Sequence, residues 1–220
     1  MTGLDLNELL RGVAVGAIPI LLAITLHEVA HGWAARQRGD RTAEMLGRLS
    51  LNPLRHIDPV GTVLVPAILW FTGGLLFGWA KPVPVAFQNL RNPKRDMVFV
   101  ALAGPGANFV MALGWALVYK LTLVFGLANS VAGEFLMGMA RIGLLINVLL
   151  AAFNLLPIPP LDGGRVLRGL VSEGLGKYLD RIEPFGLIII VLLLFSGLLW
   201  AVVTPLYALV EGLVIFLVGL

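Results

Sequence analysis

Residues 12–35 read GVAVGAIPILLAITLHEVAHGWAA. The stretch is apolar apart from one cluster of ionisable residues, and only Pro19 interrupts its helical character. A helix needs about 20 apolar residues to cross a bilayer, so this stretch is long enough to span one. The whole chain has the same character, with 58% hydrophobic and 13% charged residues, whereas soluble domains have about 25% charged residues. The sequence therefore predicts an integral membrane protein.

Further apolar stretches predict an all-α polytopic membrane protein that forms one membrane-embedded domain over residues 1–220. About four full transmembrane helices are expected, at residues 12–35, 98–118, 135–156 and 187–203, with a short C-terminal apolar helix at 210–220. Residues 60–77 contain Pro66 and the Gly73-Gly74 pair, which favour a re-entrant path. Residues 78–85, GWAKPVPV, are too rich in proline for a helix and predict a short extended, β-like segment. Whether residues 205–220 also span stays open.

The basic residues indicate the orientation of the chain. Thirteen of the 16 lysines and arginines fall in three segments, 36–58, 78–96 and 157–186. Cytoplasmic loops carry an excess of Lys and Arg, so these segments are expected at the cytoplasmic face of a multi-pass protein of the cell membrane. Residues 60–77 must then re-enter, because a crossing would move segment 78–96 to the opposite face. The net charge of +3 lies in loops between apolar runs and does not indicate nucleic-acid binding.

The ionisable cluster of the first stretch is His27-Glu28-Val29-Ala30-His31. Two histidines four residues apart lie on one face of a helix, where both imidazoles can reach one zinc ion. Glu28 can act as general base toward a water whose pKa zinc lowers to about 7. The alternative is that both histidines are neutral, hydrogen-bonded packing residues. Charged groups at the centre of a spanning helix cost about 2.5–3.5 kcal/mol each, and three ionisable residues exceed what packing requires.

A catalytic zinc ion usually has three protein ligands and one open position. The chain has no cysteine, so the third ligand must be an oxygen or nitrogen donor. Asp162 is the best candidate, because residues 154–164, NLLPIPPLDGG, end a span on the basic side and can turn a carboxylate back into the membrane. The alternative for Asp162 is an ordinary turn aspartate beside glycine. His56, in a polar loop with Asp58 and two prolines, is the rival third ligand.

These motifs together resemble the site-2 protease family, the zinc proteases that cleave within membranes. The resemblance rests on HEVAH at 27–31, Leu161-Asp162-Gly163, the element Gly104-Pro105-Gly106-Ala107-Asn108 and the segment 78–85. It implies that His27, His31 and Asp162 are zinc ligands, that Glu28 is the base, and that Asn108 and Asn154 line the site. The alternative for both asparagines is hydrogen bonding between helices. Leu161 departs from the family pattern, in which many relatives have proline before the aspartate.

The resemblance implies a small catalytic core that hydrolyses a peptide bond within or near a transmembrane segment of its substrates, as in regulated intramembrane proteolysis. Its cofactor would be Zn²⁺, and its partners membrane-protein substrates and the lipid bilayer. The active site would open toward the cytoplasm, and residues 79–85 could hold an unwound substrate by β-strand addition. Two alternatives remain at this point: a metal-ion or small-solute transporter that uses the same histidines, and a pseudoprotease that binds membrane partners without cleaving them.

Overall fold

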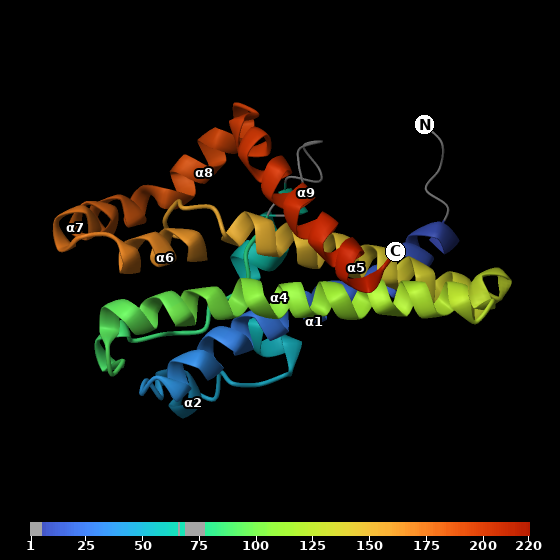
Figure 1. Ribbon diagram of the computed structural model, residues 1–220, viewed down its shortest axis with the longest axis horizontal. Helices are drawn as coiled ribbons and strands as arrows, with labels where there is room; N and C mark the ends of the chain where they lie inside the picture. The colour runs from blue at the N-terminus through green and yellow to red at the C-terminus, as the bar shows by residue number, and fades with distance from the viewer. Residues whose placement is uncertain (1–5, 66, 69–77) are drawn as a thin grey trace.

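The computed structural model describes residues 6–65, 67–68 and 78–220 (Figure 1). Within these ranges four helices are long and apolar enough to cross a membrane. They are α1 (Leu6–Gln37), α4 (Pro93–Val124), α5 (Val131–Asn154) and α9 (Leu198–Val218). The described residues contain no strand, so the prediction of an all-α membrane protein with four spans is confirmed.

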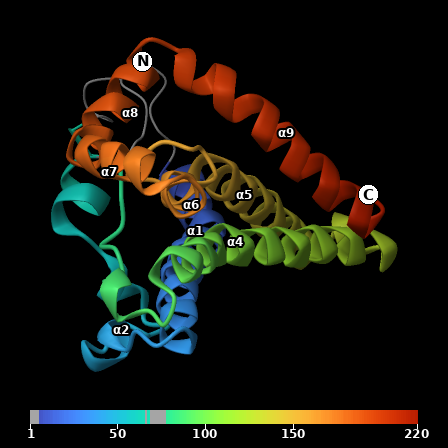
Figure 2. The same cartoon turned by 60° about the vertical axis from the view of Figure 1, so that its left-hand side comes forward.

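Short helices join and flank these four. They are α2 (Thr42–Met45), α6 (Asp162–Leu170), α7 (Glu173–Ile182), α8 (Gly186–Phe195), and the single-turn helices Pro53–His56, Pro59–Leu64, Phe87–Asn89, Leu127–Asn129 and Glu183–Phe185. Helices α1, α4 and α5 pack against one another, and α9 crosses over α4 and α5 (Figures 1 and 2). Small residues allow this close packing: a Cβ atom on Gly143 of α5 would lie 2.4 Å from the indole of Trp115 on α4.

The three basic segments lie at one end of the helix bundle. The end of α1 meets the start of α4, since Arg91 N donates to Arg38 O at 2.9 Å and Arg38 pairs with Asp96 at 3.2 Å. Helix α6 lies at the same end, where a Cβ atom on Gly169 would lie 2.8 Å from Lys94 O in α4. At the other end of the bundle, Arg11 at the start of α1 pairs with a glutamate near the start of α5. The segregation of basic residues expected from the sequence is therefore present in the fold.

The fourth span does not lie where the sequence predicted it. Residues 187–203 were expected to form one helix, but α8 ends at Phe195 and α9 begins at Leu198. Gly197 separates them with φ +76°, a left-handed conformation that ends a helix and that glycine adopts without steric cost. The spanning helix is instead 198–218, which includes the stretch expected to form a separate C-terminal helix. Pro205 lies inside this helix, as membrane helices tolerate.

Two backbone hydrogen bonds connect residues near the start of the stretch 60–77 with residues just after its end. Trp79 N donates to Gly61 O at 3.0 Å, and Lys81 N donates to His56 O at 2.9 Å. Pro66 and residues 69–77 lie outside the described residues, and the re-entrant path therefore stays a prediction. Residues 78–86 adopt no regular secondary structure, so the β-like segment predicted there is not confirmed.

Candidate metal centre

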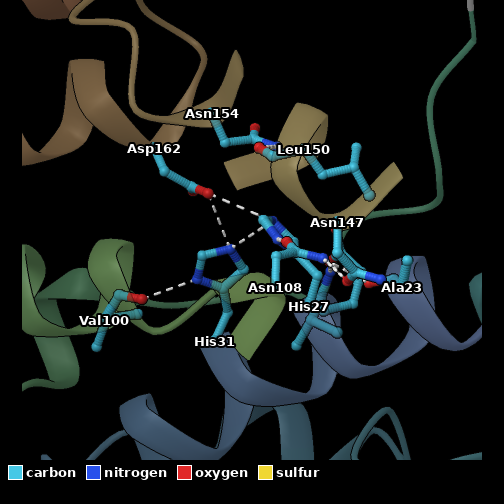
Figure 3. Close-up of polar contacts among 11 residues, drawn as sticks. Ala23, His27, His31, Val100, Asn108, Asn147, Leu150, Asn154 and Asp162 are labelled. Atoms are coloured by element: carbon cyan, nitrogen blue, oxygen red, sulfur yellow. Dashed lines mark hydrogen bonds and ion pairs between the residues drawn. The ribbon is translucent and has the colours of Figure 1, made fainter. Parts of the chain in front are cut away.

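The two histidines of the HEVAH motif lie one turn apart on α1 and point toward α4 (Figure 3). Their ring centroids are 4.7 Å apart, and both side chains are buried. Gly104 of α4 makes room for them, because a Cβ atom there would lie 2.3 Å from His31 Nε2 and 2.7 Å from His27 Cε1. The glycine of the Gly104–Asn108 element thus allows two imidazoles to fit between α1 and α4.

Asp162 reaches the histidines from the first residue of α6. The chain between α5 and α6 folds tightly: a Cβ atom on Gly163 would lie 2.3 Å from the carbonyl oxygens of Leu155 and Leu156, and one on Gly164 would lie 2.5 Å from Pro159 N. Only glycine fits these two positions. The turn places Asp162 Oδ2 at 3.3 Å from His27 Nε2 and 3.2 Å from His31 Nε2 (Figure 3).

These three residues offer donor atoms that lie within 4.8 Å of one another and could hold a metal ion. His31 Nδ1 donates to the carbonyl oxygen of Val100 at 2.8 Å, and His27 Nδ1 lies 2.5 Å from Asn108 Oδ1. Because both acceptors engage Nδ1, each Nε2 presents a lone pair toward Asp162. Asp162 Oδ2 is buried without a hydrogen-bond partner. The donor set of two imidazoles and one carboxylate therefore fits zinc.

Glu28 and the three donor residues line a cavity of about 160 Å³. The opposite wall comes from the irregular segment 78–86 and the turn after it, through Pro82, Val83, Val85 and Phe87. Glu28 Oε2 accepts a hydrogen bond from Val83 N at 2.7 Å. Arg165, one turn after Asp162 in α6, also lines the cavity and lies 5.0 Å from the ring centroid of Phe87. The cavity thus lies between α1, α6 and the segment 78–86, with further wall residues from α4 and α5.

The remaining residues predicted from the sequence take different places. Asn154 lines the cavity, and its Nδ2 donates to Leu150 O of its own helix. Asn108 is fully buried behind His27 and is not on the cavity wall. His56, the rival third ligand, is buried elsewhere, with Nε2 bonded to Ser50 O at 2.8 Å. It does not belong to the group of potential ligands found among the described residues.

Three features of the site were missed in the sequence. Asn147 of α5 contacts Asn108, and its signal was an amide within an apolar helix, since polar residues in spans are costly. Arg165 follows Asp162 at helical spacing, which places it beside the same cavity. The role of the Val83 backbone N–H could not be predicted, because every residue except proline carries the same group.

Comparison with protein families gives a match over residues 15–142 and 122–197 to the model described as Peptidase family M50. The chain belongs to peptidase family M50. The matched ranges of this M50 peptidase contain HEVAH, the Gly104–Asn108 element and the turn that carries Asp162. The resemblance to the site-2 proteases is thereby confirmed.

Curated relatives of this M50 peptidase include bacterial and archaeal proteins. One is YwhC of Bacillus subtilis, named as a candidate zinc metalloprotease, which is 36% identical over 82% of this chain and 80% of its own length. Rip2 of Mycolicibacterium smegmatis, named in the same way, is 33% identical over 80% of this chain and 64% of its own length. The zinc metalloprotease MJ0392 of Methanocaldococcus jannaschii is 26% identical over 74% of this chain and 36% of its own length. No solved structure matches the chain.

Proposed function

We propose that this chain is an intramembrane zinc metalloprotease, which hydrolyses a peptide bond within or near a transmembrane segment of membrane-protein substrates. The observation that carries the proposal is the convergence of His27 Nε2, His31 Nε2 and Asp162 Oδ2 beside Glu28 in one cavity. Family membership and the names of the relatives support a metalloprotease. The transporter and pseudoprotease alternatives are not favoured by either.

His27, His31 and Asp162 would hold the zinc ion as three protein ligands and leave one position open. When bound, zinc supplies Lewis acidity that polarises the scissile carbonyl and acidifies water. Glu28 accepts a proton from the attacking water as the oxygen bonds to the carbonyl carbon. It then returns a proton to the amine nitrogen as the C–N bond breaks. Asn154, on the same cavity wall as Asp162, is placed to orient substrate polar groups.

A helical substrate must unwind before cleavage, because its carbonyl groups are hydrogen-bonded along the helix. The segment 78–86 forms a wall of the cavity and is the surface on which an unwound strand would lie. This segment has few free N–H groups, since Pro82 and Pro84 lack one and Val83 N is bonded to Glu28.

The orientation of the protein belongs to the same proposal. The end of the bundle that carries the three basic segments also carries the turn of Asp162, and cytoplasmic loops are enriched in Lys and Arg. The cavity would thus open toward the cytoplasm from the cell membrane, where regulated intramembrane proteolysis of membrane-protein substrates would take place.

The decisive experiment compares membrane-protein fragments from cells that express the native chain with fragments from cells that express Glu28→Gln. Fragments that end inside a transmembrane segment are expected only with the native chain. The purified native chain should also contain zinc, with loss of zinc and of fragments together after chelation. Identical fragments from the native chain and the Glu28→Gln variant would refute the proposal.

A further inference from the structure

A buried chain of side-chain amides leads from α5 through α4 to His27 (Figure 3). Asn147 Nδ2 donates to Gly143 O at 2.8 Å, and Asn108 Nδ2 donates to Asn147 Oδ1 at 2.9 Å. Asn108 Oδ1 then lies 2.5 Å from His27 Nδ1. Both asparagines have no exposed surface. These hydrogen bonds thus link α5, which carries no histidine, to the imidazole of His27 in the metal centre.

The backbone carbonyl groups at which these side-chain hydrogen bonds end determine which atom donates and which accepts in each bond. The carbonyl oxygen of Gly143 can only accept, so Asn147 must turn its Nδ2 toward it and its Oδ1 toward Asn108. Asn108 must then direct its Nδ2 at Asn147, and the same Nδ2 also donates to Ala23 O at 3.2 Å. The Oδ1 atom of Asn108 is left for His27. An oxygen acceptor requires a proton on His27 Nδ1 and leaves the lone pair on Nε2.

The two histidines differ in what holds them. His31 Nδ1 is bonded to a backbone carbonyl, that of Val100, which every residue type supplies. His27 depends on the side chain of Asn108, and two acceptors, Asn147 Oδ1 and Ala23 O, hold the amide of Asn108 with its Nδ2 turned away from His27. Polar partners of this kind fix the ring orientation of metal-binding histidines.

We propose that Asn147 is a positioning residue of the metal centre: it orients the amide of Asn108, which holds His27 in the tautomer that presents Nε2 to the metal. The inference rests on the proposed function, since it assumes that His27 is a ligand. It adds a residue outside the recognised motifs of the chain, on a helix that supplies no ligand, and it gives the asparagine of the Gly104–Asn108 element a defined role.

The test is a double-mutant cycle on purified protein in detergent, with zinc affinity measured by chelator competition. Asn108→Leu removes the acceptor and should weaken zinc binding about 10–100-fold, the usual cost of losing such a partner. Asn147→Leu should also weaken zinc binding, but less than Asn108→Leu does, because Ala23 O then remains as an acceptor that holds the orientation of the Asn108 amide. Asn108→Asp keeps an acceptor for His27 Nδ1 on either of two equivalent oxygens but no longer donates to Asn147 Oδ1 or Ala23 O, so the zinc affinity of this variant is the reference for the second substitution. In that background Asn147→Leu should cause no loss, because there is no orientation left to fix.

The control is Thr122→Val, which removes another buried polar side chain from α4; its hydroxyl bonds to Val118 O of its own helix and does not touch the histidines. The Co²⁺-substituted protein adds a spectroscopic measure, and its visible absorption should change in Asn147→Leu but not in Thr122→Val. At saturating zinc, Asn147→Leu should recover kcat with an unchanged KM. Equal losses of affinity from Asn147→Leu in both backgrounds would show a purely structural role and overturn the inference. If the native chain itself binds no zinc, the proposed function fails instead.

Discussion

Glu28 and Val83 are joined by a hydrogen bond of 2.7 Å from the backbone N–H of Val83 to Glu28 Oε2, although 55 residues separate them in sequence. The bond ties the carboxylate of the HEVAH motif to the irregular segment 78–86. Since Val83 also lines the cavity, the position of the proposed base and that of the substrate-facing wall depend on each other.

Substitutions of Glu28 should separate its role as the proposed base from its role in holding the segment 78–86. In Glu28→Gln the amide oxygen can still accept from Val83 N, so zinc content and the order of segment 78–86 should be retained. Cleavage should fall by about 10²–10⁴-fold or more, since general acid–base catalysis contributes this much. Glu28→Ala should lose cleavage and also increase hydrogen exchange at the amide of Val83, measured by mass spectrometry. Equal protection of Val83 in both variants would show that the hydrogen bond does not hold the segment.

Gly104 and Gly106 provide a matched pair in one helix. A Cβ atom on Gly104 would lie 2.3 Å from His31 Nε2, whereas one on Gly106 would have no atom within 4 Å. Gly104→Ala should therefore displace the imidazoles and lower zinc occupancy, measured by metal analysis of the purified protein. Gly106→Ala should keep zinc and stabilise α4 by up to about 1 kcal/mol, the helix-propensity difference between the two residues. Normal zinc content in Gly104→Ala would mean that the histidines do not pack on α4 as described.

Asp40 binds the C-terminal end of the segment 78–86, at the backbone N–H of Ala86. It is fully buried, and its carboxylate accepts hydrogen bonds from Thr42 Oγ1, Thr42 N, Ala86 N and Asn89 Nδ2. Burial raises the pKa of Asp40, but these hydrogen bonds lower it more, to below its usual value. Since the folded pKa lies below the unfolded value of about 3.9, the stabilisation is present above that pH and is lost as the pH falls through the folded pKa.

Asp40→Ala should consequently destabilise the protein at neutral pH, by about 1.5–3 kcal/mol for a hydrogen-bonded charge. The difference in melting temperature between the native chain and the variant should shrink as the pH falls below about 4. Thermal unfolding in detergent across this range measures both. If the difference in melting temperature stayed constant with pH, the destabilisation would come from lost packing contacts and not from the charge of Asp40.

Much of this arrangement could be predicted from residue patterns. The spacing of His27 and His31 places both on one helix face whatever the tertiary structure, and the Pro-Gly turn limits where Asp162 can go. The boundary at Gly197 could not be predicted, because a glycine inside an apolar run is compatible with a continuous membrane helix, and its left-handed φ of +76° follows from how α8 and α9 pack.

The contacts of Asn108 and Asn147 also could not be predicted from the sequence. The resemblance placed Asn108 on the wall of the site, but only the packing of α1, α4 and α5 decides that it lies behind His27 and contacts Asn147. Hydrogen bonds between distant helices depend on rotation and depth of each helix, which hydropathy does not specify. The bond between Glu28 and Val83 involves a backbone atom and is invisible to any residue pattern.

The orientation can be tested directly, because the native chain has no cysteine to interfere with labelling. Single cysteines at Leu51, Arg91 and Lys177, all exposed, represent the three basic segments, and one at Val131 represents the opposite end of the bundle. A membrane-impermeant maleimide applied to intact cells should label only the cysteine at 131. The other three should react only after permeabilisation. Labelling of the cysteine at 91 from outside would show that residues 60–77 cross the membrane.

Asp162 and His56 are the two candidates for the third zinc ligand, and variants of both can identify it. Two imidazoles leave a catalytic zinc ion one protein ligand short, and Asp162 Oδ2 lies 3.3 and 3.2 Å from the two Nε2 atoms without a hydrogen-bond partner of its own. His56 is bonded to Ser50 O in the loop after α2. We therefore expect Asp162→Ala to lose most of its zinc and its activity together, while His56→Ala keeps most of the bound zinc, with metal analysis of both purified variants as the measurement. Asp162→Asn, which preserves size but has only a neutral oxygen, should bind zinc more weakly than the native chain. Normal zinc content in Asp162→Ala together with loss of zinc in His56→Ala would instead require a ligand set of three histidines, and the described geometry of α6 would have no part in the metal centre.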